Sequence, residues 1–370
     1  MFASKIHRTM ATSSPYTRSV VSAMRKLYPE ALADKSFDNT GLLLESPFDP
    51  RRRQKNSVLL TIDLTTAVAD EAIRRQDSVV VAYHPIIFRG LKALTMKDTQ
   101  QQSLLRLAAA GISVYSPHTA VDCAAGGLGD WLADIVTGTS NSAPSEQSPF
   151  DADSQPQGRP THMLQHHPSQ LSIKDSRAFS RGASKHERYP ITPAKVSGHE
   201  GAGMGRIIRF PSPVPLTEII DRITLGLGNP KGFPIAVPQG KQISDMNISS
   251  IALCAGSGGS LFSEAEKKGE NVDLYFTGEL SHHEALAAIE NGKCVIALFH
   301  SNTERGFLHG VLKEQLEGQV RKEWDNLRQD EDVKQEAKKH GYPEALDEDH
   351  VEVHVSEVDR DPYGIMVSRD

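Results

Sequence analysis

Hydrophobic and polar positions in the first third of the chain follow two different periods. Residues 17–33 place apolar side chains three and four apart, which is the spacing of one face of an amphipathic helix. Strand-like apolar runs then alternate with helical patterns, in the order 57–65, 65–75, 78–85, 101–111 and 112–122. Alternating strands and helices build a largely parallel sheet covered by helices. We therefore predict a first α/β lobe over residues 17–138.

The last third of the chain repeats this alternation. The predicted strands are 203–210, 248–256, 272–278 and 294–300, and the predicted helices are 215–228, 261–269, 282–292 and 303–319. A helix at 331–340 and a strand at 351–358 close the chain. We predict a second α/β lobe over residues 201–370, and hence a fold of two related lobes with mixed, largely parallel sheets and a metal cleft between them.

Two segments lack periodic apolar residues. Residues 139–200 are rich in Ser, Pro and Gln, so they cannot bury enough surface to offset their ordering entropy, and we predict a disordered insertion. Residues 1–16 are predicted as a disordered tail. Because the first 29 residues carry Lys and Arg but no acidic residue, a mitochondrial presequence is the alternative for this end.

Composition narrows the class of protein. The chain has 370 residues and a mean hydropathy of −0.39, with no apolar run long enough to span a bilayer, so we expect a cytoplasmic protein, with mitochondrial or nuclear placement as alternatives. Its 41 basic and 47 acidic residues argue against broad nucleic-acid binding, which depends on Lys and Arg neutralising phosphates. The three cysteines form no CxxC pair, which excludes a Cys-rich zinc site.

Metal-ligand side chains follow three of the predicted strands. His84 follows one strand, His118 and Asp122 follow another, and His300 and Glu304 follow a third. In open α/β sheets, ligands bind outside the carboxyl ends of strands. Imidazole and carboxylate donors together suit Zn, Fe, Mn, Co or Ni, so we predict one or two divalent ions at these residues. The alternative for each histidine alone is a hydrogen-bonded structural role.

Two further segments contain candidate site residues. The loop with Gly256, Gly258 and Gly259 joins a strand to a helix, where exposed N–H groups favour a phosphate; a tight turn without ligand is the alternative. In TGELSHHEA, Glu279 or His283 would orient a metal ligand or serve as general acid or base, although N-capping would also explain this segment.

The loop before residue 42 adds a weaker candidate. Asp38 and Asn39 precede a glycine, which is typical of an Asx turn leading into a strand. The functional alternative is that one of these two side chains lines the same cleft as the predicted ligands.

Six motifs in register resemble those of a known family. DNTGLLLE, AYHPIIF, SPHTAVD, CAGSGGSL, YFTGELSHHEALAA and HSNTERGFL resemble the NGG-interacting-factor-three-like family, whose bacterial members are often labelled GTP cyclohydrolase I type 2 homologues. The resemblance covers roughly residues 17–138 and 201–370. It implies a di-metal centre between two lobes and a homo-hexameric ring. One departure is Tyr83, which stands where many bacterial members have a histidine before the residue equivalent to His84.

The resemblance also implies site residues and two classes of function. By position, the metal ligands are His84, Asp122, His300 and Glu304, with His118 near or in the coordination shell. One class is a metal-dependent hydrolase acting on a nucleotide or a related phosphorylated heterocycle, as the GTP cyclohydrolase label suggests. The other is a non-catalytic metal-handling or regulatory scaffold that binds protein partners, including transcription-related ones, with the disordered insertion as a docking segment.

Overall fold

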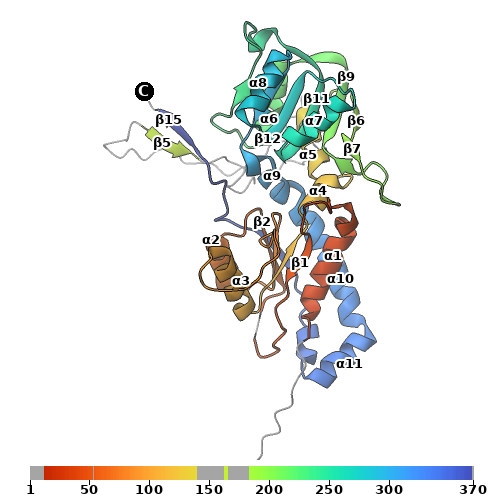
Figure 1. Cartoon of the computed structure of the whole chain (residues 1–370). Helices are drawn as coiled ribbons and strands as arrows, with labels where there is room; N and C mark the ends of the chain where they lie inside the picture. Colours follow the sequence, from red (N-terminus) through yellow and green to blue (C-terminus); the bar gives the residue numbers. More distant parts are fainter. Residues whose placement is uncertain (1–11, 53, 140–161, 166–182, 369–370) are drawn as a thin grey trace, which may run out of the picture. The chain divides into compact units, whose positions relative to one another are not determined.

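The computed structural model of the chain describes residues 12–52, 54–139, 162–165 and 183–368 (Figure 1). The chain divides into two compact units: unit 1 comprises residues 1–118 and 311–359, and unit 2 comprises residues 119–310 and 360–370. This division differs from the predicted lobe boundaries. The chain enters unit 2 before residue 138, and a long C-terminal segment returns to unit 1.

Unit 1 contains a five-stranded sheet in the order β1-β4-β3-β2-β14. Its strands are β1 (Gly41–Leu44), β2 (Ser57–Thr61), β3 (Val79–Ala82), β4 (Ser113–Ser116) and β14 (Glu352–Val355). β14, β2, β3 and β4 are parallel to one another, and β1 is antiparallel to β4. The return of the C-terminal segment is explained by β14, which extends this sheet beside β2.

Helices cover both faces of the unit 1 sheet (Figure 1). They are α1 (Pro15–Leu27), α2 (Thr66–Arg75), α3 (Thr99–Ala110), α10 (Lys313–Gln329) and α11 (Glu331–His340). Leu59, Val80 and Val114 are register partners on neighbouring strands and belong to one core with residues of α2 and α3. On the other face α1 packs along α10, where the Tyr16 and Trp324 rings meet edge-on with centroids 5.5 Å apart.

Unit 2 contains a six-stranded sheet in the order β10-β13-β12-β11-β9-β6. Its strands are β6 (Glu187–Tyr189), β9 (Arg206–Pro215), β10 (Ile235–Ala236), β11 (Asn247–Ser257), β12 (Leu274–Glu279) and β13 (Cys294–Ala297). The central strands β11, β12 and β13 are parallel, and the flanking strands are antiparallel to their neighbours. Two short pairs accompany this sheet: β15 (Ile365–Ser368) with β5 (His162–Gln165), and β7 (Thr192–Pro193) with β8 (Gly203–Met204).

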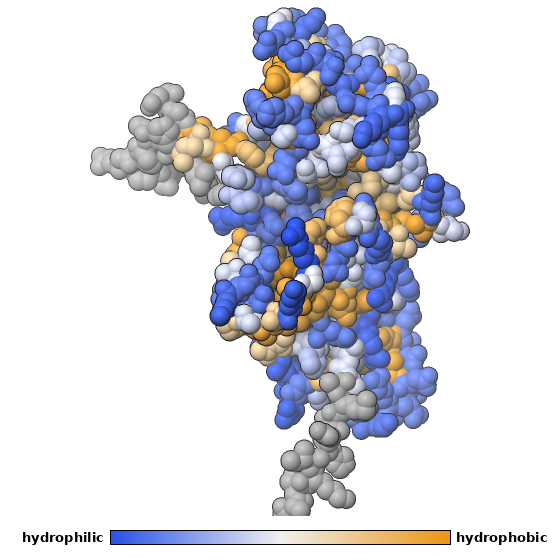
Figure 2. Space-filling model, in the orientation of Figure 1, coloured by the Kyte–Doolittle hydropathy of each residue, from blue (hydrophilic) through white to orange (hydrophobic). Residues whose placement is uncertain are grey.

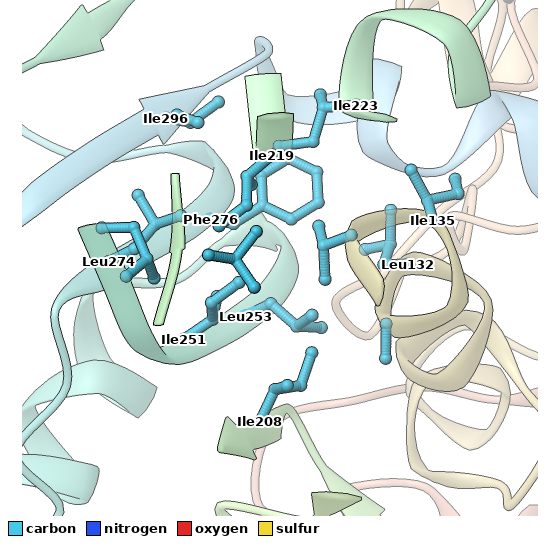
Figure 3. Packing of buried hydrophobic residues seen from close by; sticks show 14 of the residues in the cluster. Leu132, Ile135, Ile208, Ile219, Ile223, Ile251, Leu253, Leu274, Phe276 and Ile296 are labelled. Atoms are coloured by element: carbon cyan, nitrogen blue, oxygen red, sulfur yellow. The ribbon is translucent and has the colours of Figure 1, made fainter. Parts of the chain in front are cut away.

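The core of unit 2 lies on the face covered by α5 (Leu128–Thr137) and α6 (Leu216–Gly226). Figure 3 shows Leu132 and Ile219 from these helices beside Phe276 of the sheet. The opposite face packs against α7 (Gly259–Lys267) and α8 (His282–Glu290). The repeated strand–helix alternation therefore forms β2-α2-β3-α3-β4 in unit 1 and β11-α7-β12-α8-β13 in unit 2. The predicted α/β fold with mixed, largely parallel sheets is confirmed.

Three local predictions need correction. Residues 187–193 lie in the segment predicted as disordered, but they form β6 and β7, because β6 pairs with β9 and Ile191 is buried. Residues 1–11, 140–161 and 166–182 lie outside the described residues. The strand-like run predicted over 112–122 forms a strand only at β4, and the short helix α4 (Thr119–Cys123) follows. The single helix predicted over 303–319 begins as short helical turns, with a π-helical turn at Leu308–Leu312 before α10.

The surface is consistent with the polar composition. The face drawn in Figure 2 is mainly hydrophilic, with smaller hydrophobic areas between polar ones. Within the described part of the chain, no helix combines the length and apolar character that a bilayer crossing requires.

Candidate metal centre

His84 of unit 1 is held by its backbone and by its Nδ1 atom. It lies two residues beyond the carboxyl end of β3, where its backbone N–H donates to the carbonyl of Ile62 at 3.0 Å. Its Nδ1 lies 2.9 Å from Oδ1 of Asp63, which follows the neighbouring strand β2. A carboxylate accepts the Nδ1 proton, so this pairing leaves the lone pair on Nε2.

His118 repeats this arrangement beyond β4. Its Nδ1 lies 2.7 Å from Oδ1 of Asp38, whose side chain is fully buried. Its ring centroid lies 5.5 Å from that of His84, and the buried Tyr83 ring contacts both imidazoles. The backbone φ of His118 is +35°, which is unusual for a residue with a side chain and typical of functional sites. Asp38 therefore orients a histidine instead of serving only as a turn residue.

His300 and Glu304 form the corresponding cluster in unit 2. Nδ1 of His300 lies 2.9 Å from Oε1 of Glu279, at the end of β12. Nε2 of His300 lies 3.7 Å from Oε1 of Glu304, whose residue is only 2% exposed. Phe299, directly before His300, has φ of +67° and ψ of 155°, a conformation that costs about 1–3 kcal/mol in a residue with a side chain.

Glycines allow the backbone of unit 2 to approach this cluster closely. A Cβ atom added to Gly256 would lie 2.9 Å from Nε2 of His300 and 3.0 Å from Oε1 of Glu304. A Cβ on Gly278 would lie 2.6 Å from the carbonyl oxygens of Gly256 and His300. Gly256 also donates its N–H to Oγ1 of Thr303 at 2.9 Å. Only glycine leaves the space in front of the two donor atoms open.

Asp122 belongs to the same unit as His300 and Glu304. Burial, followed by the negative charges of Asp122 and Glu304, raises the pKa of the Cys254 thiol. The two carboxylates therefore influence one buried group on β11, and the thiol donates to the carbonyl of Ala255 at 3.1 Å.

Two aspartates near the C-terminus support the two clusters. Asp359 in unit 1 accepts hydrogen bonds from the backbone N–H groups of Ile62 and Asp63, at 2.7 and 3.3 Å. Asp361 in unit 2 accepts from the N–H of Ser301 at 3.1 Å and from its hydroxyl at 2.6 Å. Both aspartates are buried, so each fixes the backbone next to a candidate ligand.

The glycine loop and the segment after β12 contain the remaining predicted site residues, and both make contacts within unit 2 that give them a structural role. Gly258 and Gly259 lie at the start of α7, and a Cβ on Gly259 would lie 2.0 Å from Oε1 of Glu284. A carboxylate thus already lies at this helix N-terminus, and anion binding by the glycine loop stays a prediction. Ser281 and Glu284 form a capping box at the start of α8, as the structural alternative expected. His283 is exposed there, with its ring against that of His282.

Comparison with known proteins places the chain in a family. The family model described as Duf34/NIF3 (NGG1p interacting factor 3) matches residues 15–329. The chain belongs to the NIF3 family. A Schizosaccharomyces pombe relative called protein NIF3 homolog is 42% identical over 303 residues, covering 81% of this chain and 88% of its own length. NGG1-interacting factor 3 of Saccharomyces cerevisiae is 34% identical over 299 residues, covering 80% of this chain and 88% of its own.

Solved structures of NIF3-like proteins share the fold. A hypothetical protein from Staphylococcus aureus aligns with a TM-score of 0.59 at 18% identity, covering 95% of this chain and 99% of its own. A Bacillus cereus protein related to NIF3 aligns with a TM-score of 0.58 at 19% identity, covering 96% and 99%. At these identities the likeness supports the fold alone.

The donors of this NIF3-family chain fit a divalent metal ion. Within unit 2, His300 and Glu304 offer ligand atoms that could hold one. Nε2 of His300 and Oε1 of Glu304 lie farther apart than a hydrogen bond allows, yet an ion about 2.0–2.2 Å from each atom would fit between them. The space kept open by Gly256 lies in front of the same two atoms.

Sequence reasoning missed Asp63, Asp359 and Asp361. Asp63 falls inside the apolar run 57–65 and was included in the predicted strand, but β2 ends at Thr61. A polar residue interrupting the end of an apolar run was the one available signal. The two C-terminal aspartates act through contacts with residues far away in the chain, which no local pattern reveals.

Proposed function

We propose that this protein is a divalent-metal-dependent hydrolase that acts on a nucleotide or a related phosphorylated heterocycle. One or two ions would be held by His84 and His118 from unit 1 and by three residues from unit 2, Asp122, His300 and Glu304. The donor types suit Zn, Fe, Mn, Co or Ni. Assembly into a homo-hexamer stays a prediction.

One observation carries the metal assignment. All three candidate imidazoles have Nδ1 against a carboxylate: His84 against Asp63, His118 against Asp38, and His300 against Glu279. Metal-binding histidines almost always donate their second N–H to such a partner, which fixes the ring and the tautomer. Three histidines with one shared design favour a common ligand over three separate structural roles.

Several of the residues named above lie close in sequence to the points where the chain passes from one unit to the other. The chain crosses from unit 1 to unit 2 between residues 118 and 119, and again between residues 359 and 360. His118 and Asp122 lie four residues apart across the first crossing, and Asp359 and Asp361 lie two apart across the second. Because each residue extends the chain by at most about 3.6 Å, four residues span at most about 14 Å. This limit applies to the backbone of His118 and Asp122, which are consecutive proposed ligands along the chain.

The protein's own groups have distinct roles in the proposed hydrolysis. When bound, a divalent ion would lower the pKa of a water ligand towards about 7. Asp63 and Glu279 keep the imidazoles of His84 and His300 in the tautomer with the lone pair on Nε2. We assign Glu279 to this orienting role. His283, exposed in the first turn of α8, is the residue that we propose for proton exchange with solvent.

The tyrosine before His84 bears on how many ions we propose for the site. Tyr83 is 3% exposed and packs its ring against His84 and His118, while its carbonyl accepts a hydrogen bond from Ser116. We propose that His118 supplies the imidazole of the second position. A Tyr83→His variant would then add a donor and raise the metal content of a partly loaded protein.

Elemental analysis tests the metal site. Protein purified without chelators should contain bound metal, and Glu304→Gln and His300→Ala should lose most of it. Glu290→Gln, which removes an exposed carboxylate of α8, and His199→Ala are the matched controls and should retain it. Equal metal content in all five proteins would refute the site.

Turnover is tested separately. Protein loaded with Mn, Fe, Co or Zn should hydrolyse GTP or a related phosphorylated heterocycle, and Glu304→Gln should abolish the activity. Loaded protein that turns over none of these substrates with any metal would refute the hydrolase proposal and leave the metal site standing.

A second candidate function follows from the name of one relative. The Saccharomyces cerevisiae relative is named for an interaction with NGG1. The corresponding proposal is a regulatory scaffold that binds a transcription-related protein through residues 139–200. Deleting residues 140–182 should then abolish partner capture without changing the metal content. Unchanged capture would refute this role of the segment.

A further inference from the structure

A second group of metal-ligand residues lies near the C-terminus, within unit 1. Nε2 of His350 lies 2.7 Å from Oε1 of Glu352, and Nε2 of His354 lies 2.9 Å from Oε2 of the same carboxylate. The side chains are 58%, 40% and 34% exposed in chain order, so solvent reaches all three. We refer to these three residues as the edge triad.

The spacing of the edge triad follows from the strand that carries it. The residues alternate with Val351 and Val353, which are 3% and 2% exposed. Glu352 and His354 lie on β14, where successive side chains point to opposite faces, so these two share a face opposite to Val353, while His350 lies two residues before the strand. β14 is the last strand in the sheet order and pairs only with β2 there, so this face lies at a sheet edge.

Two carboxylates supply negative charge at and beside the edge triad. Hydrogen bonds from His354 and His350, with their positive charge when protonated, lower the pKa of Glu352 to about 2, so this carboxylate is ionised at neutral pH. His354 also interacts electrostatically with Asp77, whose side chain is fully buried.

We propose that His350, Glu352 and His354 form a binding site for a borderline divalent transition-metal ion, Zn²⁺, Ni²⁺ or Cu²⁺. Two imidazoles and one carboxylate match the donors that these ions prefer. The two Nε2 atoms lie beside different oxygens of Glu352, so the exposed side chains must rotate before all three donors can lie about 2.0–2.2 Å from one ion. Three protein donors leave a fourth position for water or a further ligand. This site is separate from the metal centre described above.

The structural alternative is a charged edge. Native sheets often place charged residues on edge strands to prevent pairing with another chain, and an ion-paired His-Glu-His group would serve that purpose without a metal. The two explanations differ in one measurable property, because only the first requires a stoichiometric ion held by two imidazole nitrogens.

The test uses the full chain in a His300→Ala/Glu304→Ala background, which removes ligands of the first centre. This parent is titrated with Cu²⁺ by calorimetry, and its electron paramagnetic resonance spectrum is recorded for coupling to nitrogen. His350→Asn/His354→Asn and Glu352→Gln are compared with the control His199→Asn/His340→Asn, which removes two histidines elsewhere. Circular dichroism melting confirms that each variant is folded. Residues 162–167, which include three histidines, are unchanged in every variant.

The expected result is one ion per parent chain at the edge triad, with a spectrum showing two coupled nitrogens. His350→Asn/His354→Asn and Glu352→Gln should weaken this binding by on the order of ten-fold or more, since even residues behind a ligand cost that much. The control should bind like the parent. A parent that binds no ion, or triad variants that bind as tightly as the control, would overturn the proposal. Failure of the first centre would instead appear in the chain that still carries His300 and Glu304.

Discussion

Replacing Gly256 by alanine should separate metal binding from folding. Gly256 has φ of +61°, and an added Cβ would lie 2.9 Å from Nε2 of His300 and 3.0 Å from Oε1 of Glu304. Placing alanine in the left-handed region costs about 1–2 kcal/mol wherever it occurs. The close approach adds a second effect that acts only on the two ligand atoms.

The size of that second effect follows from the contact distances. Ordinary contacts of a Cβ begin near 3.4 Å, so the Nε2 and Oε1 atoms must move by roughly 0.5 Å. Metal–ligand distances tolerate only about ±0.2 Å. Disturbing a single support of a ligand typically weakens metal affinity about 10–100-fold. With two ligands displaced, we expect a loss on the order of 100-fold, which corresponds to about 2.7 kcal/mol.

Gly292→Ala is the matched control. Gly292 also lies in unit 2, has φ of +76°, and would place its Cβ with no heavy atom within 4 Å. Urea unfolding of metal-free protein should show both variants destabilised by about 1–2 kcal/mol. Calorimetric titration with Zn²⁺ should show weakened binding for Gly256→Ala only. Equal affinities in the two variants would refute the placement of the ion in front of Gly256.

Three further predictions test individual supports. Asp63→Asn lets an amide donate to Nδ1 of His84 and shifts the proton to Nε2, so calorimetry should show metal affinity about 10–100-fold lower. Asp361→Asn removes the charged acceptor of two hydrogen bonds and should lower the urea-derived free energy of unfolding by about 1–3 kcal/mol. Asp130→Asn leaves the buried Arg206 guanidinium without its carboxylate and should cost about 3–5 kcal/mol. Burial opposes ionisation of Asp130, but Arg206 holds the pKa of this carboxyl below its ordinary value. The ionised Asp130 therefore stabilises the fold above the pKa of the unfolded carboxyl, and this stabilisation is lost as pH falls through the pKa of the folded state. The stability of Asp130→Asn should accordingly depend less on pH in acid.

The spacing of apolar residues was sufficient to predict the helices and strands, but not to predict how the chain divides into two units. Buried strands with apolar runs, such as β2 and β3, and helices with one apolar face, such as α2, were located within a few residues. The return of residues 311–359 to unit 1 could not be predicted, because it depends on the pairing of β14 with β2, far away in the chain. Strand pairing between distant segments leaves no mark in the local pattern.

The same limit applies to the candidate site. His84, His118 and His300 could be singled out because each follows an apolar run that ends at the edge of a sheet. Their orienting partners could not be assigned in the same way. Asp63 and Asp38 reach their histidines from positions 21 and 80 residues away in the chain. The sequence therefore indicates which histidines lie at the ends of strands. Contacts with carboxylates far away in the chain determine the orientation of each imidazole ring.

The geometry around His300 within unit 2 bears on whether this histidine binds a metal or has only a structural role. The nitrogens of a structural imidazole make hydrogen bonds of ordinary length. Nδ1 of His300 makes such a contact, 2.9 Å from Oε1 of Glu279. On its other side, the same ring lies 3.7 Å from the nearly buried Glu304 carboxylate, which is too far for a hydrogen bond. A direct ion pair would close this distance, whereas a cation shared by both atoms would hold it open. Gly256, with its left-handed backbone, keeps a Cβ atom away from both donor atoms, as the proposed metal site requires.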